Sequence, residues 1–295
     1  MRQGSVADLA GVMDLWAGDV RAGVRDSLPS EDRMARMLAG FDWEASARMV
    51  EGADGSIEGA VLVSSRPAPI GTIAVIEAST TSGRPELSAD LTRWGLGLAK
   101  AAGATTALVW RGRGHSDGLD RLGLELVRQW WRMDRKLATE PPAPPAVAGY
   151  ELRDGTSAPR HRWAETHNLA FADHWRFVPR DEDELTAAPP ELRLMALAQD
   201  GAPVALTLCQ IVNYTGDRRL QPVGIVNSVG TLPAHRRRGL ATWLVAEALV
   251  RLHRAGARHA SLYVDGQSPT RAFDVYEKVG FKLAFETEVW EARFQ

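Results

Sequence analysis

A proline-rich stretch divides the chain into two parts of similar length. Thr139–Val147 reads TEPPAPPAV, and its four prolines remove backbone donors and fix φ, which excludes a helix. The whole chain has 295 residues, which is enough for two domains of ordinary size. We therefore expect a first domain over residues 1–138, an extended linker over 139–147 and a second domain over 148–295.

The two parts repeat one order of elements. Each opens with a short strand, at Met1–Gln3 and Tyr150–Arg153, followed by an amphipathic helix. A second helix is expected to begin at a proline, Pro29 or Pro179, with acidic residues in its first turn. An Asp-Gly turn between apolar runs then predicts a hairpin in each part, and a strand, a long helix and another strand follow. Each part is expected to end in a short helix and its own last strand. This order predicts a duplicated α+β fold, each copy a mixed, mostly antiparallel sheet flanked by helices.

The stretch most informative about chemistry joins a strand to a helix in the second part. It runs from Asn227 to Thr242 and reads NSVGTLPAHRRRGLAT, with three arginines in a tight loop. A helix N-terminus presents unpaired N–H groups and partial positive charge, so that a pyrophosphate fits there. Gly239 and Ala241 keep the approach free of bulk. A basic, solvated turn before a surface helix is the plain alternative.

Two motifs together resemble those of the GNAT superfamily of acyl-CoA N-acyltransferases. The run from Arg236 to Ala241 is similar to its pyrophosphate signature, R/Q-x-x-G-x-G/A. The run from Ala272 to Phe281 is similar to its closing motif, A-x-x-x-Y-x-x-x-G-F. The resemblance covers the second part of the chain. The tandem arrangement, with motifs only in the second copy, resembles that of the mycothiol synthase group.

The resemblance implies how acetyl-CoA, the expected cosubstrate, would bind. In this superfamily the strands on either side of the loop and helix diverge, and the pantetheine pairs with backbone at the end of the first strand. Ser268 stands where the family often has asparagine; serine can cap the closing helix but reaches the pantetheine less well. The implied cofactor contacts are Val229, Gly230, Thr231, Arg236, Arg237, Arg238, Gly239, Leu240, Ala241, Thr242, Ser268 and Ala272.

The catalytic groups are only partly identified. Tyr276 matches the family tyrosine, which would protonate the departing CoA thiolate; packing in the core is the plain alternative. Many family members carry a glutamate base on the strand before the loop, whereas residues 225–228 read IVNS. Asn227 can orient an amine or a water but cannot accept a proton. His167 and His174, on the acceptor side, are candidate bases or simply packed histidines.

The first part lacks these motifs. Residues 78–86 read ASTTSGRPE, which contains no R-x-x-G-x-G/A, and Glu86 would place a negative charge near a phosphate. Residues 115–124 contain no tyrosine. We therefore expect a degenerate copy that shapes the acceptor cleft.

Composition limits the remaining partners. The formal net charge is −2, which gives no general attraction to nucleic acid or a membrane surface, and no run approaches the ~20 apolar residues of a membrane span. The single cysteine, Cys209, lies in an apolar run, so we expect a buried thiol, no disulfide and no metal site.

The sequence thus predicts a cytoplasmic N-acetyltransferase that acts on a small-molecule amine, as a monomer or a homodimer. Two alternatives stay open: a non-catalytic or regulatory acyl-CoA-binding protein, and a protein N-acetyltransferase. Turnover of an amine would exclude the first alternative, and an acceptor cleft open at both ends would favour the second.

Overall fold

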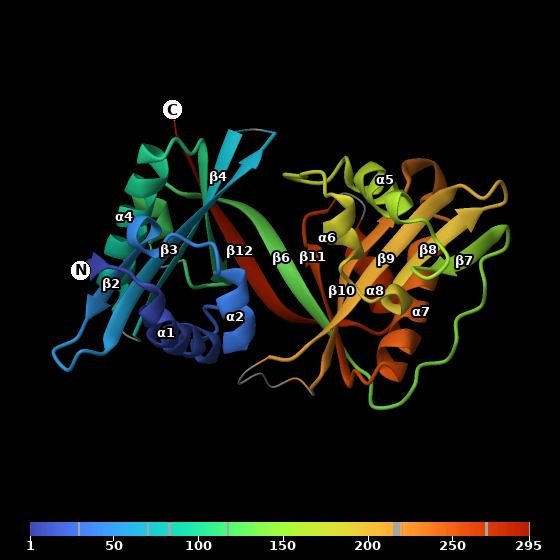
Figure 1. Cartoon of the computed structure of the whole chain (residues 1–295), viewed down its shortest axis with the longest axis horizontal. Helices are drawn as coiled ribbons and strands as arrows, with labels where there is room; N and C mark the ends of the chain where they lie inside the picture. Colours follow the sequence, from blue (N-terminus) through green and yellow to red (C-terminus); the bar gives the residue numbers. More distant parts are fainter. Residues whose placement is uncertain are drawn as a thin grey trace. The chain divides into compact units, whose positions relative to one another are not determined.

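The structure is a computed structural model that describes residues 1–28, 30–69, 71–81, 84–116, 118–214, 219, 221–268 and 271–294. It contains two compact units (Figure 1). The first unit comprises Met1–Trp130, Tyr214–Asp217 and Phe285–Gln295, and the second comprises Trp131–Asn213 and Arg218–Ala284.

The first unit is built on a sheet with the strand order β1-β2-β3-β4-β5-β12. The pairs are antiparallel except for β4 with β5, which run parallel because the helix α4 crosses over between them. The elements are β1 (Arg2–Gln3), η1 (Val6–Asp8), α1 (Leu9–Ala22), α2 (Glu31–Met37), α3 (Trp43–Ser46), β2 (Ala47–Glu51), β3 (Ile57–Ala68), β4 (Gly71–Thr80), α4 (Pro85–Ala101), β5 (Thr106–Gly112), η2 (Leu119–Leu122), the start of β6 (Glu125–Lys136) and most of β12 (Lys282–Arg293).

Alternation along β3 divides the core of the first unit into two layers. Val61 and Val63 pack with α4 on one face, whereas Ala60 and Leu62 pack with α1 and α2 on the other. Because successive side chains of a strand point to opposite faces, one strand contributes to both layers. The sheet therefore lies between α4 on one side and α1 with α2 on the other (Figure 1).

The second unit repeats this plan with the strand order β6-β11-β10-β9-β8-β7. Again one pair is parallel, β10 with β11, and the helix α7 connects them. The elements are β6 from Trp131 on, β7 (Tyr150–Asp154), α5 (Arg160–Phe171), α6 (Glu182–Thr186), η3 (Pro190–Leu192), β8 (Arg193–Ala198), β9 (Pro203–Val212), β10 (Val223–Thr231), η4 (Pro233–His235), α7 (Leu240–Arg254), β11 (His259–Asp265) and α8 (Ala272–Lys278).

The core of the second unit again lies on both faces of its sheet. Leu194 of β8 belongs to the larger cluster, which α7 and α8 cover. Its neighbour Met195 belongs to the smaller cluster, with Trp163 of α5 and Leu185 of α6. Cys209 lies in the larger cluster, and burial raises the pKa of its thiol to about 12, so the expected buried thiol is confirmed.

The last strand of each half, β6 and β12, is present as predicted, but the sheet that each one joins differs from expectation. The sequence suggested that each copy ends in its own strand, but Thr287–Arg293 of β12 pairs antiparallel with β5 of the first unit. The neighbour of β11 in the second unit is β6, whose last residues precede the linker. There Ser261 Oγ donates to Asp134 Oδ1 (2.6 Å), and Leu137 N donates to Arg258 O (2.9 Å). The two closing strands are exchanged between the sequence halves.

The first helix of each unit agrees with prediction, with small differences at other helix ends, and the proline-rich stretch lies inside the second unit. Residues 139–147 contain no helix or strand. The helix α6 begins at Glu182 rather than at Pro179, and Asp181 caps it by accepting from Glu184 N (2.8 Å). Pro29 lies outside the described residues, and Ser30 is the N-cap of α2. In the first unit the expected last short helix is the single 3-10 turn η2.

Candidate active site

The loop between β10 and α7 presents backbone donors to open space. Gly239 is the N-cap residue of α7, with φ of 85°, and no side chain caps the helix. Trp243 N donates to Gly239 O (3.0 Å), and this is the first backbone hydrogen bond of the helix. Among the described residues, the N–H groups of residues 237–242 have no carbonyl partner. A Cβ on Gly239 would meet nothing within 4 Å. The glycine is therefore required by its left-handed backbone, and the space in front of the turn is open.

Arg236 ties this loop to the end of α5. Its guanidinium forms a bidentate ion pair with Asp173 (2.6 and 3.0 Å), which follows α5. It also donates to Thr231 O (3.1 Å) and Ala170 O (3.2 Å). The hydrogen bond from Arg236 lowers the pKa of Asp173. Much of the positive charge of Arg236 is thus neutralised within the protein, which leaves its neighbours Arg237 and Arg238 more exposed beside the turn.

A second set of contacts orders the same loop from β7. The hydroxyl of Tyr150 lies 3.0 Å from His235 Nδ1, and Arg238 Nη1 donates to that hydroxyl (3.1 Å). Arg237 has φ of 66°, a left-handed conformation that is unusual for a residue with a side chain. The chain there is held in one shape by contacts at both ends of the loop. Sequence reasoning missed Tyr150, His235 and Asp173, because nothing in the local pattern marks residues that pair across the fold.

The end of β10 has a free edge. Its pairing with β11 ends at Val226 opposite Leu262, whereas its pairing with β9 continues to Thr231 opposite Ala205. A register shift between Val226 and Ser228 makes Asn227 a bulged residue, and its exposed side chain accepts from Gln210 Nε2 (3.3 Å). Residues 228–231 therefore pair with β9 on one edge only, and no strand of the described residues pairs with their other edge.

Tyr276 lies on α8 with its ring in the main core. Its side chain is buried against Phe281 (ring centroids 6.3 Å apart), and it belongs to the same cluster as Leu240 of α7. Burial raises the pKa of the phenol, so the hydroxyl is protonated at neutral pH. No described residue hydrogen-bonds to this hydroxyl. It is a buried proton donor with its donor capacity unused inside the protein.

The segment before α8 differs from expectation. The N-cap of α8 is Arg271, with φ of 51° and no capping hydrogen bond from its own side chain, and not Ser268, which the sequence offered as a possible cap. Ser268 is buried, and its N–H donates to Asp265 O (3.1 Å). Ala272 is the first residue of α8 and is partly buried against the main core.

An aromatic cluster of α5 and the residues after it packs against the end of β10. His167 is 4% exposed and stacks on Phe171 (centroids 4.5 Å apart), which in turn contacts His174 (5.2 Å). Burial lowers the pKa of His167, so the imidazole is neutral at neutral pH. A Cβ on Gly230 would lie 2.7 Å from Cε2 of Phe171 and 2.9 Å from Cβ of Ala170, so α5 packs directly on the end of β10.

Two other kinds of feature are absent from the described residues. None of their helices combines the length and apolarity that crossing a bilayer requires. Their His, Cys, Asp and Glu side chains form no group of three that is placed to hold a metal ion.

Comparison with known proteins agrees with this geometry. The profile of the Acetyltransferase (GNAT) family matches residues 160–281. A mycothiol acetyltransferase of Catenulispora acidiphila is 36% identical over 171 residues, which is 54% of this chain but only 52% of that protein. The mycothiol acetyltransferase of Nocardia farcinica is 30% identical over 235 residues, which is 77% of this chain and 71% of that protein.

A solved structure extends the likeness to both units. The GCN5-related N-acetyltransferase from Sphaerobacter thermophilus aligns with a TM-score of 0.82 at 23% identity, over 99% of this chain and 94% of that one. At this identity the match establishes the fold. Together with the Nocardia relative and the family profile, it shows that the chain belongs to the acetyltransferase (GNAT) family of N-acetyltransferase enzymes.

Proposed function

We propose that the second unit transfers an acetyl group from acetyl-CoA to the amine of a small molecule. The observation that carries this proposal is the loop between β10 and α7, where a left-handed Gly239 opens unpaired N–H groups to free space. A pyrophosphate would bind this turn through the N–H groups of residues 237–242, assisted by the charges of Arg237 and Arg238. The cosubstrate is expected to be acetyl-CoA, without a metal.

The free edge of β10 suits the pantetheine arm. Residues 229–231 continue past the last pair with β11, so their backbone groups are available to the amides of an extended ligand, as an added strand would be. Ala272 and Ser268 flank the same region in our proposal. In this arrangement Arg236 acts mainly through Asp173, by fixing the loop, rather than through direct contact with phosphate.

The chemistry requires a neutral amine, a stabilised oxyanion and a protonated leaving group. The amine nitrogen attacks the thioester carbon, and the tetrahedral oxyanion collapses as the C–S bond breaks. Tyr276 donates its proton to the CoA thiolate; its raised pKa keeps that proton in place until it is needed. A backbone N–H near Val229 or Gly230 is our candidate for the oxyanion donor.

The proton acceptor is the least defined part of the proposal. Asn227 is exposed beside the free edge of β10 and can orient the amine. His167 is buried in the aromatic stack, and we assign it to packing. His174, partly buried at the end of α5, is the residue that we would test as a base.

The acceptor is proposed to be a small molecule, in the cytoplasm. The relatives named mycothiol acetyltransferase support this class, and the aromatic cluster of α5 offers apolar contact area next to Gly230. The amine whose acetylation gives mycothiol is therefore the first acceptor to test. Protein acetylation and binding without turnover are the outcomes that would replace this proposal.

The test is calorimetric titration of acetyl-CoA into the wild type, Gly239→Glu and Gly239→Ala. Both variants lose the same backbone freedom, but only glutamate adds bulk and negative charge where the pyrophosphate would lie. We expect one equivalent bound by the wild type, little change in Gly239→Ala beyond a lower stability, and a loss of affinity of ~100-fold or more in Gly239→Glu. Equal affinity in Gly239→Glu would show that this loop is not the cofactor site.

A further inference from the structure

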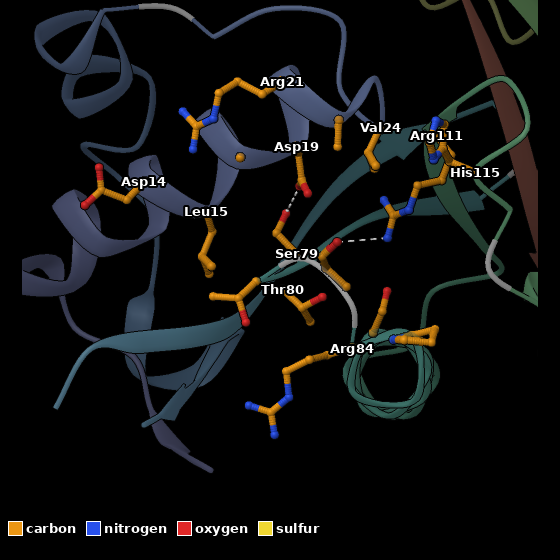
Figure 2. A pocket seen from close by; sticks show the side chains of 16 residues that line it. Asp14, Leu15, Asp19, Arg21, Val24, Ser79, Thr80, Arg84, Arg111 and His115 are labelled. Carbon is orange, nitrogen blue, oxygen red and sulfur yellow. Dashed lines mark hydrogen bonds between the residues drawn. The ribbon is translucent and has the colours of Figure 1, made fainter. Parts of the chain in front are cut away.

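The first unit contains a cavity of about 610 Å³. It lies between α1, the ends of β4 and β5, and the first turn of α4 (Figure 2). Sites for small molecules usually have volumes of ~300–1,000 Å³, so a small metabolite would fit. The cavity occupies the place in the first unit that corresponds to the β10–α7 loop and its free edge in the second.

This cavity is not a copy of the acyl-CoA site. Pairing of β4 with β5 ends at Ile76 opposite Val109, as the pairing of β10 with β11 ends in the second unit. Two residues later the buried side chain of Arg111 crosses the gap and donates to Ala78 O (2.8 Å), as Figure 2 shows. Counted from Leu262, the matching residue of the second unit is Val264. A pantetheine arm along β4 would have to displace the guanidinium.

Hydrogen-bond donors without protein partners line the cavity. Ser88, in the first turn of α4, is 7% exposed, and no described residue hydrogen-bonds to its hydroxyl. Within the described part of the chain, the hydroxyls of Thr80 and Thr81 are also without a partner, as are the side chains of Arg21 and His115. The N-terminus of α4 adds the partial positive charge of its backbone, and the acidic residue of the same turn, Glu86, is exposed and lies outside the cavity lining.

The charges around the cavity are of both signs. Arg84 precedes α4 and forms an ion pair with Glu58 of β3. Asp14 is exposed on α1, whereas Asp19 is buried and accepts from Ser79 Oγ (2.6 Å), which ties α1 to the end of β4 (Figure 2). Asp19, the acid that faces β4, is therefore hydrogen-bonded to Ser79. The hydroxyl and cationic donors that line the cavity stay available for a ligand.

We propose that this cavity binds a small molecule that carries a compact oxyanion, a phosphate or a carboxylate. The oxyanion lies against the first turn of α4, where it accepts from Ser88 and the threonine hydroxyls, and Arg21 and His115 supply charge or further hydrogen bonds. The first unit is then a second ligand site with a chemistry different from acyl-CoA. The inference is independent of the function proposed for the second unit.

The experiment is calorimetry on the full-length chain with inorganic phosphate and with malonate, at ionic strength held constant by chloride. The variants are Ser88→Ala, the double variant Arg21→Gln/His115→Gln, and Arg36→Gln as a control that removes a charge on α2 outside the cavity. We expect saturable binding of at least one probe, weakened about tenfold or more in the double variant and in Ser88→Ala, and unchanged in the control. Thermal unfolding checks that each variant is folded.

Three results would overturn the proposal. The first is that neither probe binds saturably. The second is that binding survives in the double variant but is lost in Gly239→Glu, which would place the anion at the loop of the second unit. The third is a second equivalent of acetyl-CoA that the Arg21→Gln/His115→Gln change removes. That result would show that Arg111 yields and that the cavity takes acyl-CoA after all.

Discussion

At the scale of single residues, Tyr276 both packs in the core of the second unit and is the proposed general acid. The phenol is buried in the core, and its raised pKa preserves the proton that the proposed reaction consumes. We expect Tyr276→Phe to lower kcat by ~10²–10⁴-fold, with the affinity for acetyl-CoA within a few-fold of wild type, because only the proton donor is removed. Steady-state kinetics and calorimetry measure the two effects. Tyr214→Phe, a change in the first unit, is the control, and unchanged kcat in Tyr276→Phe would exclude the phenol as the acid.

The ion pair between Asp173 and Arg236 gives a prediction about pH. The pKa of Asp173 is lower in the folded state than in the unfolded chain, so its stabilisation is fully present above ~pH 4 and is lost as the pH falls through the folded value. Because Asp173 is 56% exposed, solvent screening limits the coupling to roughly 1 kcal/mol or less. A double-mutant cycle with Asp173→Asn and Arg236→Gln, by urea unfolding at neutral pH and near pH 3, should show weaker coupling at the lower pH. Equal coupling at both values would contradict the assignment.

At the scale of elements, the contact of α5 with β10 is proposed to border the acceptor. An alanine at Gly230 would clash with Phe171 and Ala170, so α5 or the strand end must shift. We expect Gly230→Ala to cost about 1–3 kcal/mol of stability and to raise KM for the amine. Gly224→Ala, on the same strand, meets only the side chain of Leu252 and is the matched control. It should lower stability without changing KM, and an equal rise in KM for both variants would show that α5 does not border the acceptor.

The elements also show what the sequence can and cannot reveal. The loop at Gly239 and the Asp-Gly hairpins were predictable, because a left-handed glycine and a tight turn leave a local signature. The partner of Arg236 was not, since Asp173 lies 63 residues away and any exposed acid would look the same in sequence. The cap of α8 was also missed, because Ser268 is a good capping residue by type but the helix starts four residues later.

At the scale of the whole molecule, the main feature that the sequence did not predict is which sheet each closing strand joins. The side-chain pattern of β12 is the same whichever sheet it joins, so sequence alone assigned it to the half that contains it. The expected range 1–138 lacks β12, which belongs to the sheet of the first unit. The expected range 148–295 lacks β6, which belongs to the sheet of the second unit. Residues 148–295 lack Met133 and Leu137, both 1% exposed in the core of the second unit.

This difference makes a prediction about fragments. Losing two buried apolar side chains removes ~1.5–3 kcal/mol each, together with the hydrogen bonds of β6, out of a total stability of ~5–15 kcal/mol. We therefore expect a fragment of residues 148–295 to unfold at much lower urea concentration than a fragment of residues 131–284, which retains every strand of the second unit. The fragment of residues 131–284 should also retain acetyl-CoA binding. If residues 148–295 were equally stable, the pairing of β6 with β11 would contribute little, and each half would fold as the sequence first suggested. If only 131–284 folds cooperatively, the second unit depends on a strand from the first half of the chain.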